Sequence, residues 1–190
     1  MSKTKDKRMK TMDYVLSAVC ATLIAVCSWI SVPTMVPFTL QTMAVFLVLE
    51  LIGGKRGTLS ILVYILLAAI GVPVLAGFSG GMGALLGMTG GYIVGFVFIG
   101  LTYWLSEVLC GGNRVVRIVA MIVGMAICYV FGTVWFMTVY AKQLGPISLK
   151  TALSWCVIPF LIPDAVKLVL AVTLGARLRK VLRIYEETNA

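Results

Sequence analysis

Long apolar segments alternate with short connections that hold most of the charged residues, and this pattern constrains the fold more than any other feature of the sequence. A helix needs about 20 mostly apolar residues to cross the hydrocarbon core of a bilayer. Six segments approach this length, at residues 13–32, 37–54, 57–70 (or to 76), 90–112, 115–140 and 152–182. We therefore predict an all-α membrane protein in which residues 1–190 form a single integral membrane domain with six transmembrane helices.

The scarcity of charged side chains supports this prediction. Only 12% of the residues are charged, whereas soluble domains average about 25%. Lipid must therefore take the place of water over most of the protein surface. The first apolar segment follows a basic N-terminus, as in a signal peptide, but it is too long for one and no A-x-A cleavage pattern follows. We interpret it as an uncleaved transmembrane helix.

The basic residues predict how the chain is oriented. They lie at the ends of the apolar segments rather than in a groove, which argues against nucleic-acid binding despite a net charge of +9. Basic residues collect on the cytoplasmic side of membrane proteins. One side of the six-helix arrangement receives Lys3, Lys5, Lys7, Arg8, Lys10, Lys55, Arg56, Arg114, Arg117, Arg177, Arg179, Lys180 and Arg183. The other side has only Lys142 and Lys150, so we predict that both termini are cytoplasmic.

Several classes of activity lack the residues that they need. The sequence has no histidine, which removes the usual general base and the commonest metal ligand. Its five cysteines show no C-x-x-C spacing, and it contains no Walker A or dinucleotide-binding motif. We therefore predict no metal site, no cofactor and no catalytic residue. A transporter of this kind would take its energy from a partner subunit or an ion gradient, and without an inverted repeat a self-sufficient carrier is less favoured.

Two connections on the predicted outer side are uncharged. The first covers residues 31–42. The second, between helices three and four, covers residues 71–91 and holds eight of the 19 glycines. An apolar, Gly-rich loop is tolerated near a membrane when it folds back onto the protein and lines a cavity. The alternative is a mobile loop that merely covers helix ends.

An acidic and a basic residue lie inside the last apolar region, where charged side chains are costly. Asp164 and Lys167 are three residues apart and therefore share one face of a helix. They either bind a ligand in a cavity, which we favour, or form an ion pair that only holds the helix in place. We expect Ser148 to cap a short interfacial helix that ends at Pro159, with Pro163 opening the true span; one long, kinked span is the alternative.

Further polar groups lie where segments begin on the outer side. Thr39 and Gln41 precede the second helix, where they either cap it or face a ligand. Ser79 lies in the Gly-rich loop, and Thr89 stands shortly before Tyr92. The tyrosine offers a hydroxyl and a ring face, although aromatic residues at this level are commonly membrane anchors.

Two acidic residues lie near the predicted inner side. Glu50 is close in sequence to Lys55 and Arg56, and Glu107 is close to Arg114. We expect both carboxylates to be solvated or paired at the cytoplasmic interface, and a role in proton transfer has less support.

The first helix carries a stripe of small residues. Ser17, Ala21 and Ala25 recur at four-residue intervals and leave a flat surface that another helix can approach closely. The sequence leaves open whether that helix belongs to the same bundle or to another chain.

Three stretches together resemble one known family over nearly the whole chain. They are VPFTLQT (36–42), GVPVLAG to SGGMGALLGMTGGY (71–92) and IPDAVKLVLA (162–171). In combination they are similar to the biotin-binding S components of energy-coupling-factor (ECF) transporters, the BioY family. One departure is Met88, which stands where the family often has proline before Thr-Gly-Gly-Tyr.

The resemblance implies a multi-pass subunit of a bacterial plasma membrane that captures biotin from outside. It would work with a membrane coupling subunit and two cytoplasmic ATPase subunits, so ATP is used by the partners and not by this chain. The family's biotin-binding acidic and lysine pair maps onto Asp164 and Lys167. The candidate substrate-binding residues are Asp164, Lys167, Gln41, Ser79, Thr89 and Tyr92. The stripe that contacts the coupling subunit maps onto Ser17, Ala21 and Ala25, which we expect to face lipid in the isolated subunit.

The chemistry of biotin fits the pair at residues 164 and 167. Its ureido ring offers two N–H donors and one carbonyl, which suit a carboxylate and an ammonium. The group that meets the biotin carboxylate stays open, with Lys167 as one choice. The alternatives are an S component for another vitamin, a membrane enzyme that uses Asp164 as acid or base, and a structural bundle without a ligand.

Overall fold

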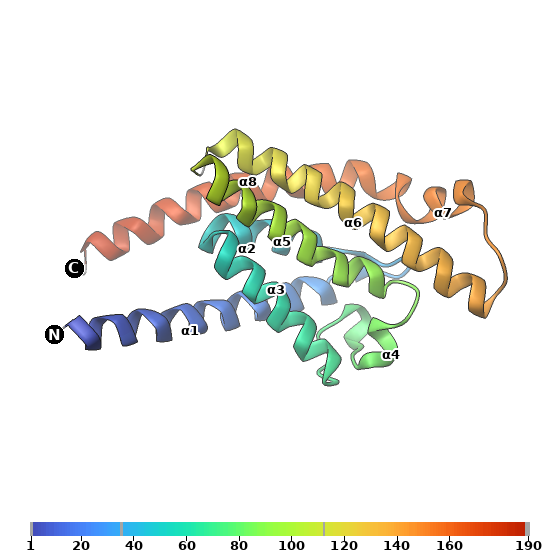
Figure 1. Cartoon of the computed structure of the whole chain (residues 1–190), viewed down its shortest axis with the longest axis horizontal. Helices are drawn as coiled ribbons and strands as arrows, with labels where there is room; N and C mark the ends of the chain where they lie inside the picture. Colours follow the sequence, from blue (N-terminus) through green and yellow to red (C-terminus); the bar gives the residue numbers. More distant parts are fainter. Residues whose placement is uncertain (1, 35, 112, 189–190) are drawn as a thin grey trace.

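The chain folds into an elongated bundle whose helices run roughly along its long axis (Figure 1). The computed structural model describes residues 2–34, 36–111 and 113–188, with no account of the side chains at 2–10, 12 and 181–188. The N-terminal basic cluster and Arg183 therefore lie outside the described side chains. The elements are α1 (Ser2–Trp29), β1 (Ser31–Val32), β2 (Phe38–Thr39), α2 (Gln41–Ile52), α3 (Gly54–Ala69), the 3₁₀ helix η1 (Ala76–Phe78), α4 (Met82–Leu85), α5 (Gly90–Cys110), α6 (Arg114–Gln143), α7 (Leu149–Cys156) and α8 (Ile158–Thr188).

The fold consists mainly of helices, several of them long and apolar, as the sequence predicts for a membrane protein. By length and composition, three helical stretches of the described chain can cross a bilayer: Gly90–Cys110, Arg114–Gln143 and Leu149–Lys180. Two further apolar helices, Asp13–Trp29 and Gln41–Ile52, are shorter. The predicted boundaries of the fourth and fifth segments differ from α5 and α6 by no more than a few residues.

The second predicted segment is helical over only part of its length. α2 has 12 residues and is about 18 Å long, well below the roughly 30 Å of a hydrocarbon core. Before it lie two short strands, and β1 pairs with β2 in an antiparallel ribbon that aligns Val32 with Phe38. α2 is buried on nearly every side, from Gln41 to Glu50, which explains why its sequence is apolar all round.

The connections fall into two groups at opposite ends of the bundle. The turns between α2 and α3 and between α5 and α6 lie toward the end that holds both termini, whereas the α3–α5 connection and α7 lie at the other end (Figure 1). The first group contains Lys55, Arg56 and Arg114, and the residue 71–91 connection is uncharged. The helices therefore alternate in direction along the bundle, and the side of the membrane on which each end lies stays a prediction.

The region before the last helix is partly as predicted. Ser148 caps α7, because its Oγ accepts a hydrogen bond from the backbone N–H of Thr151 at 3.2 Å. The prediction that this helix ends at Pro159 and that Pro163 opens the next one is wrong. The break falls at Val157, and α8 begins at Ile158 with Pro163 inside it. Pro159 occupies the first turn of α8, where its missing N–H costs no helical bond.

The small-residue stripe of α1 is buried, so the expectation that it faces lipid is wrong. Ser17, Ala21 and Ala25 are each no more than 3% exposed, because α1 packs against α2 and α3 on this face. Their small side chains allow that close approach. A contact between this stripe and a coupling subunit would require α1 to separate from its neighbours, and that role stays a prediction.

Enlarging a residue of the stripe is expected to destabilise the bundle. We expect Ala21→Val to lower the free energy of unfolding by about 1–3 kcal/mol, because the site is fully packed. Thermal unfolding in detergent measures this loss. The control Ala18→Val adds the same methyl groups at an exposed position of α1 and should leave the unfolding temperature near the parental value. Equal stability of the two variants would show that the stripe is loosely packed.

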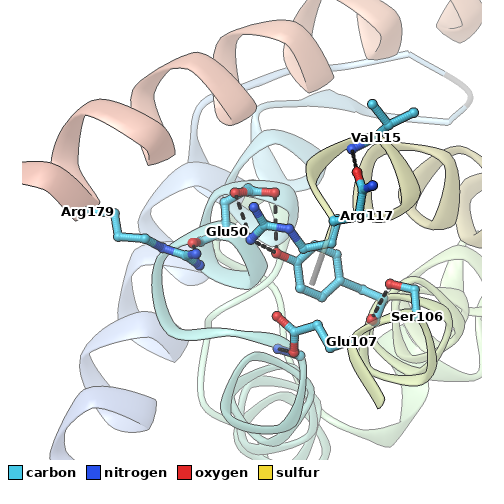
Figure 2. A network of polar contacts seen from close by, with 9 residues as sticks. Glu50, Ser106, Glu107, Val115, Arg117 and Arg179 are labelled. Atoms are coloured by element: carbon cyan, nitrogen blue, oxygen red, sulfur yellow. Dashed lines mark hydrogen bonds and ion pairs between the residues drawn. The ribbon is translucent and has the colours of Figure 1, made fainter. Parts of the chain in front are cut away.

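A network of charged side chains joins four helices near the end that holds the termini. Glu50 is only 4% exposed. Its carboxylate accepts a hydrogen bond from the Tyr103 hydroxyl at 3.2 Å and lies 3.6 Å from Arg117 Nη1. Arg117 also donates to the Tyr103 hydroxyl at 3.1 Å, and Arg179 donates to the backbone carbonyl of Glu50 (Figure 2). Glu50 is therefore paired rather than solvated, and its partner is Arg117 rather than Lys55 or Arg56, which are closer in sequence.

Candidate ligand-binding site

A cavity of about 180 Å³ lies between the residue 36–42 stretch, the Gly-rich connection and helices α5, α6, α7 and α8. All six residues that the sequence marks as candidate substrate contacts line it. The complete lining is Val36, Pro37, Thr39, Gln41, Thr42, Leu75, Ala76, Ser79, Thr89, Tyr92, Ile93, Phe96, Met125, Cys128, Tyr129, Cys156, Phe160, Asp164 and Lys167.

The charged pair of α8 forms one wall of the cavity. Asp164 and Lys167 are 6% and 4% exposed, and Lys167 Nζ donates to Asp164 Oδ1 at 2.8 Å. The other carboxylate oxygen, Oδ2, accepts a hydrogen bond from the Tyr129 hydroxyl of α6 at 2.6 Å. Each carboxylate oxygen has two lone pairs, and an ammonium has three donors. Both groups therefore retain hydrogen-bonding capacity for a ligand after these internal bonds are made.

Phe38 of β2 covers the ammonium group. Lys167 Nζ lies 4.2 Å from the centre of the Phe38 ring, which is a cation–π contact. The same ring stacks on Phe160 of α8 at 5.8 Å between centroids. The two contacts hold β2 against α8 and place Phe38 beside the charged wall.

Gln41 begins α2 and joins the cavity to the Gly-rich connection. Its Nε2 donates to the Tyr64 hydroxyl at 2.8 Å, and that hydroxyl donates to the Val74 carbonyl at 3.1 Å. Ser28 Oγ also donates to Val74. Val74 and Leu75 are buried, so the connection folds back onto the bundle. Lining by Leu75, Ala76 and Ser79 confirms that this loop borders a cavity.

The other candidate residues lie on the α4–α5 side. The Tyr92 hydroxyl is 2.9 Å from Thr133 Oγ1 of α6. A Cβ at Gly132 would lie 2.2 Å from the Tyr92 ring, so only glycine leaves room for the ring there. Ser79 Oγ donates to the Ala76 carbonyl at 2.8 Å, and Thr89 precedes the first turn of α5.

Two lining residues of the cavity, Tyr129 and Phe160, and Phe38, which packs on the lining residues Lys167 and Phe160, were not anticipated from the sequence. Tyr129 lies inside a long apolar segment, where its hydroxyl needs a hydrogen-bond partner. Its position in the sequence could therefore have marked it as a candidate. Phe38 and Phe160 look like any apolar residue in sequence, because only the fold brings their rings together. Among the described residues, no group of three or more cysteine, aspartate or glutamate side chains is placed to hold a metal ion.

Comparison with known proteins identifies close relatives. Residues 1–184 match the model of the BioY family. The probable biotin transporter BioY of Pyrococcus horikoshii is 38% identical over 173 residues, covering 90% of this chain and 98% of the relative. The biotin transporter BioY of Thermotoga maritima is 36% identical over 171 residues, covering 87% of this chain and 95% of the relative. A crystal structure of the S-component for biotin from an ECF-type ABC transporter superposes with a TM-score of 0.78 at 27% identity, covering 91% and 93% of the two chains.

Proposed function

We propose, since the chain belongs to the BioY family, that it is the biotin-binding S component of an ECF transporter. The observation that carries the proposal beyond family membership is the cavity, where Asp164 and Lys167 form a buried charged wall beside apolar rings. Asp164 would accept from the ureido N–H groups, and Lys167 would donate to the ureido carbonyl. Ile93, Phe96 and Phe160 would contact the apolar rings and chain of biotin.

The cavity is small for this ligand in the structure described here. Its volume of about 180 Å³ is below the roughly 300 Å³ at which small-molecule sites usually begin. Lys167, which lines the cavity, has its ammonium group against the Phe38 ring. We therefore expect the residue 36–39 stretch to shift when biotin enters, so that Lys167 exchanges the ring for the ligand.

Direct binding tests the proposed ligand. Isothermal titration of detergent-purified protein with biotin, thiamine and riboflavin should give saturable binding of biotin alone. Preference for another vitamin would reassign the ligand within the same architecture. Turnover of biotin, or binding of none of the three vitamins, would contradict the proposal.

We propose that this subunit works with an energy-coupling module made of a membrane coupling subunit and two cytoplasmic ATPases. The family and the S-component likeness support this assignment. We also propose six crossings with both termini in the cytoplasm. The second crossing would then combine β2, which runs toward α2, with α2 itself, and non-helical backbone at that depth is tolerated where protein surrounds it.

Cysteine labelling tests the orientation. Cys110 is exposed at the end of α5 that we place inside, and Ser79 is exposed at the other end of the bundle. In intact cells, a membrane-impermeant maleimide should label a Ser79→Cys variant and should reach Cys110 only after permeabilisation. A Cys110→Ser background isolates the first signal. Labelling of Cys110 from outside would invert the topology.

Removing the Tyr129 hydroxyl is expected to weaken biotin binding by about tenfold or more. The hydroxyl holds Asp164 Oδ2 at 2.6 Å, and a hydrogen bond to a charged group contributes about 1.5–3 kcal/mol. Titration of Tyr129→Phe with biotin measures the effect. The control Tyr140→Phe removes a hydroxyl from the same helix outside the cavity lining and should bind like the parent. Parental affinity in Tyr129→Phe would mean that the hydroxyl does not position the carboxylate.

A further inference from the structure

A second hollow, larger than the ligand cavity, lies on the flank of the bundle between α6 and α8. We call it the α6–α8 groove. Its volume is about 690 Å³. Apart from Tyr129 and Asp164 at one end, Thr173, and Arg114 at the other end, its side chains are apolar. The apolar walls include Ile122 and Ala126 of α6 and Ala165 and Val169 of α8.

The groove exists because its two walls pack on different neighbours. α6 lies along α5, and α8 packs on α2, so α6 and α8 make hardly any direct contact with each other. Phe46 of α2 forms the floor. Ala126 and Ala165 are small, which keeps the groove wide between the walls. Several wall residues, including Ile122 and Val169, are exposed.

An acyl chain is the occupant that matches this shape and lining. In a bilayer, lipid chains are the available molecules, and an unfilled apolar groove forfeits dispersion contacts along its walls. Arg114 and Met125 are separated by eleven helical residues, or about 16 Å, which is close to half of the roughly 30 Å hydrocarbon core. The stretch between them therefore corresponds in depth to the chains of one leaflet.

The charge at the mouth of the groove favours an anionic headgroup. Arg114 is exposed, and among the described side chains it has no ion-pair partner. Its neighbour Arg117, by contrast, is taken up by Glu50. Arg114 also stands in the first turn of α6, where the helix end adds partial positive charge. A phosphate at this level would meet a free guanidinium, which suits phosphate oxygens well.

We propose that the α6–α8 groove binds an anionic phospholipid of the cytoplasmic leaflet, with an acyl chain between the helices and the phosphate at Arg114. The inference rests on the proposed membrane orientation but not on biotin being the ligand. Met125, Tyr129 and Asp164 line both this groove and the ligand cavity, so the lipid chain would also back the wall that holds the charged pair.

Native mass spectrometry of the detergent-purified chain tests the headgroup. Phosphatidylglycerol and phosphatidylcholine with identical acyl chains are titrated in parallel. We expect phosphatidylglycerol to bind about fivefold more tightly, since one basic residue near a membrane surface contributes about 1 kcal/mol. Arg114→Gln should remove this preference. Lys55→Gln, an exposed basic residue at the same end that does not line the groove, should preserve it.

A second pair of variants tests the acyl chain. Ala126→Trp fills the groove and should weaken binding of both lipids at least fivefold. Val123→Trp places the same ring on an exposed part of α6 outside the groove and should leave both affinities near parental. The proposal fails if Arg114→Gln keeps the headgroup preference, or if the two tryptophan variants bind lipid equally. It also fails if Ala126→Trp leaves the lipid affinities unchanged but prevents a coupling subunit from co-purifying. That result would mean that a helix of the coupling subunit occupies the groove. Biotin titration of the same samples reports separately on the proposed function.

Discussion

Replacing Asp164 by asparagine or Lys167 by alanine is expected to weaken biotin binding by roughly 30-fold to several thousandfold. The two side chains form a buried pair with a 2.8 Å bond in the cavity wall. Losing one member of a desolvated, hydrogen-bonded charged set costs about 2–5 kcal/mol of binding free energy. Part of that cost comes from the charge that remains buried without its partner. Isothermal titration of each purified variant with biotin measures the loss.

A double variant separates a ligand-binding pair from a structural one. Asp164→Leu combined with Lys167→Met removes both charges, leaves no unpaired ion and keeps similar side-chain volumes, so the fold should survive with near-parental stability. It should not bind biotin measurably. Lys150→Ala, which removes an exposed lysine of α7, is the matched control and should bind normally. If the double variant binds biotin like the parent, the pair only holds α8 in place.

The charged pair at residues 164 and 167 was predictable because charged side chains are rare in membrane-spanning segments. An aspartate and a lysine inside an apolar segment are costly unless they face a cavity, and a three-residue spacing puts them on one helix face. The Gly-rich connection was informative for a similar reason, since an uncharged loop of that length needs protein to cover it. Both features depend on local chemistry that a single sequence displays, and in the structure both border the same cavity.

The features that were mispredicted depend on which neighbour a segment meets. An apolar segment has the same composition whether lipid or protein surrounds it, so the sequence did not show that the helical part of this segment is short and buried in protein. The stripe at Ala21 and Ala25 correctly indicates close helix packing, but small residues do not name the helix that approaches them. In the structure that helix belongs to the same bundle.

The partner of Glu50 could not be predicted either, because it lies on a helix that only the fold brings near. Its basic neighbours in sequence, Lys55 and Arg56, lie on α3, where both are exposed. Arg56 pairs instead with Asp13 of α1, 2.7 Å away. The actual partner of Glu50 is Arg117 on α6, which is far away in sequence. Proximity in sequence therefore indicated a basic partner for the Glu50 carboxylate, but it did not identify Arg117 as that partner.

Removing Arg117 alone is expected to cost about 3–5 kcal/mol of folding free energy. Arg117→Met would leave Glu50 buried at 4% exposure with only the Tyr103 hydroxyl as a side-chain partner. Breaking a buried ion pair on one side has an effect of this size, because the remaining charge is uncompensated. Glu50→Leu should cause a comparable loss by stranding the guanidinium. Thermal unfolding in detergent, followed by tryptophan fluorescence, measures both single variants.

Combining the two substitutions should recover most of the lost stability. Glu50→Leu with Arg117→Met removes both charges of this pair, and it also removes Arg117 Nε, which is buried without a hydrogen-bond partner in the described structure. A buried pair replaced by apolar side chains is often as stable as the original or more so. Biotin affinity should stay near parental in the double variant, because neither residue lines the ligand cavity. A double variant as unstable as Arg117→Met would mean that Arg117 stabilises the fold through contacts other than Glu50. A double variant with parental stability but no biotin binding would show that this network is coupled to the ligand cavity at the opposite end of the bundle.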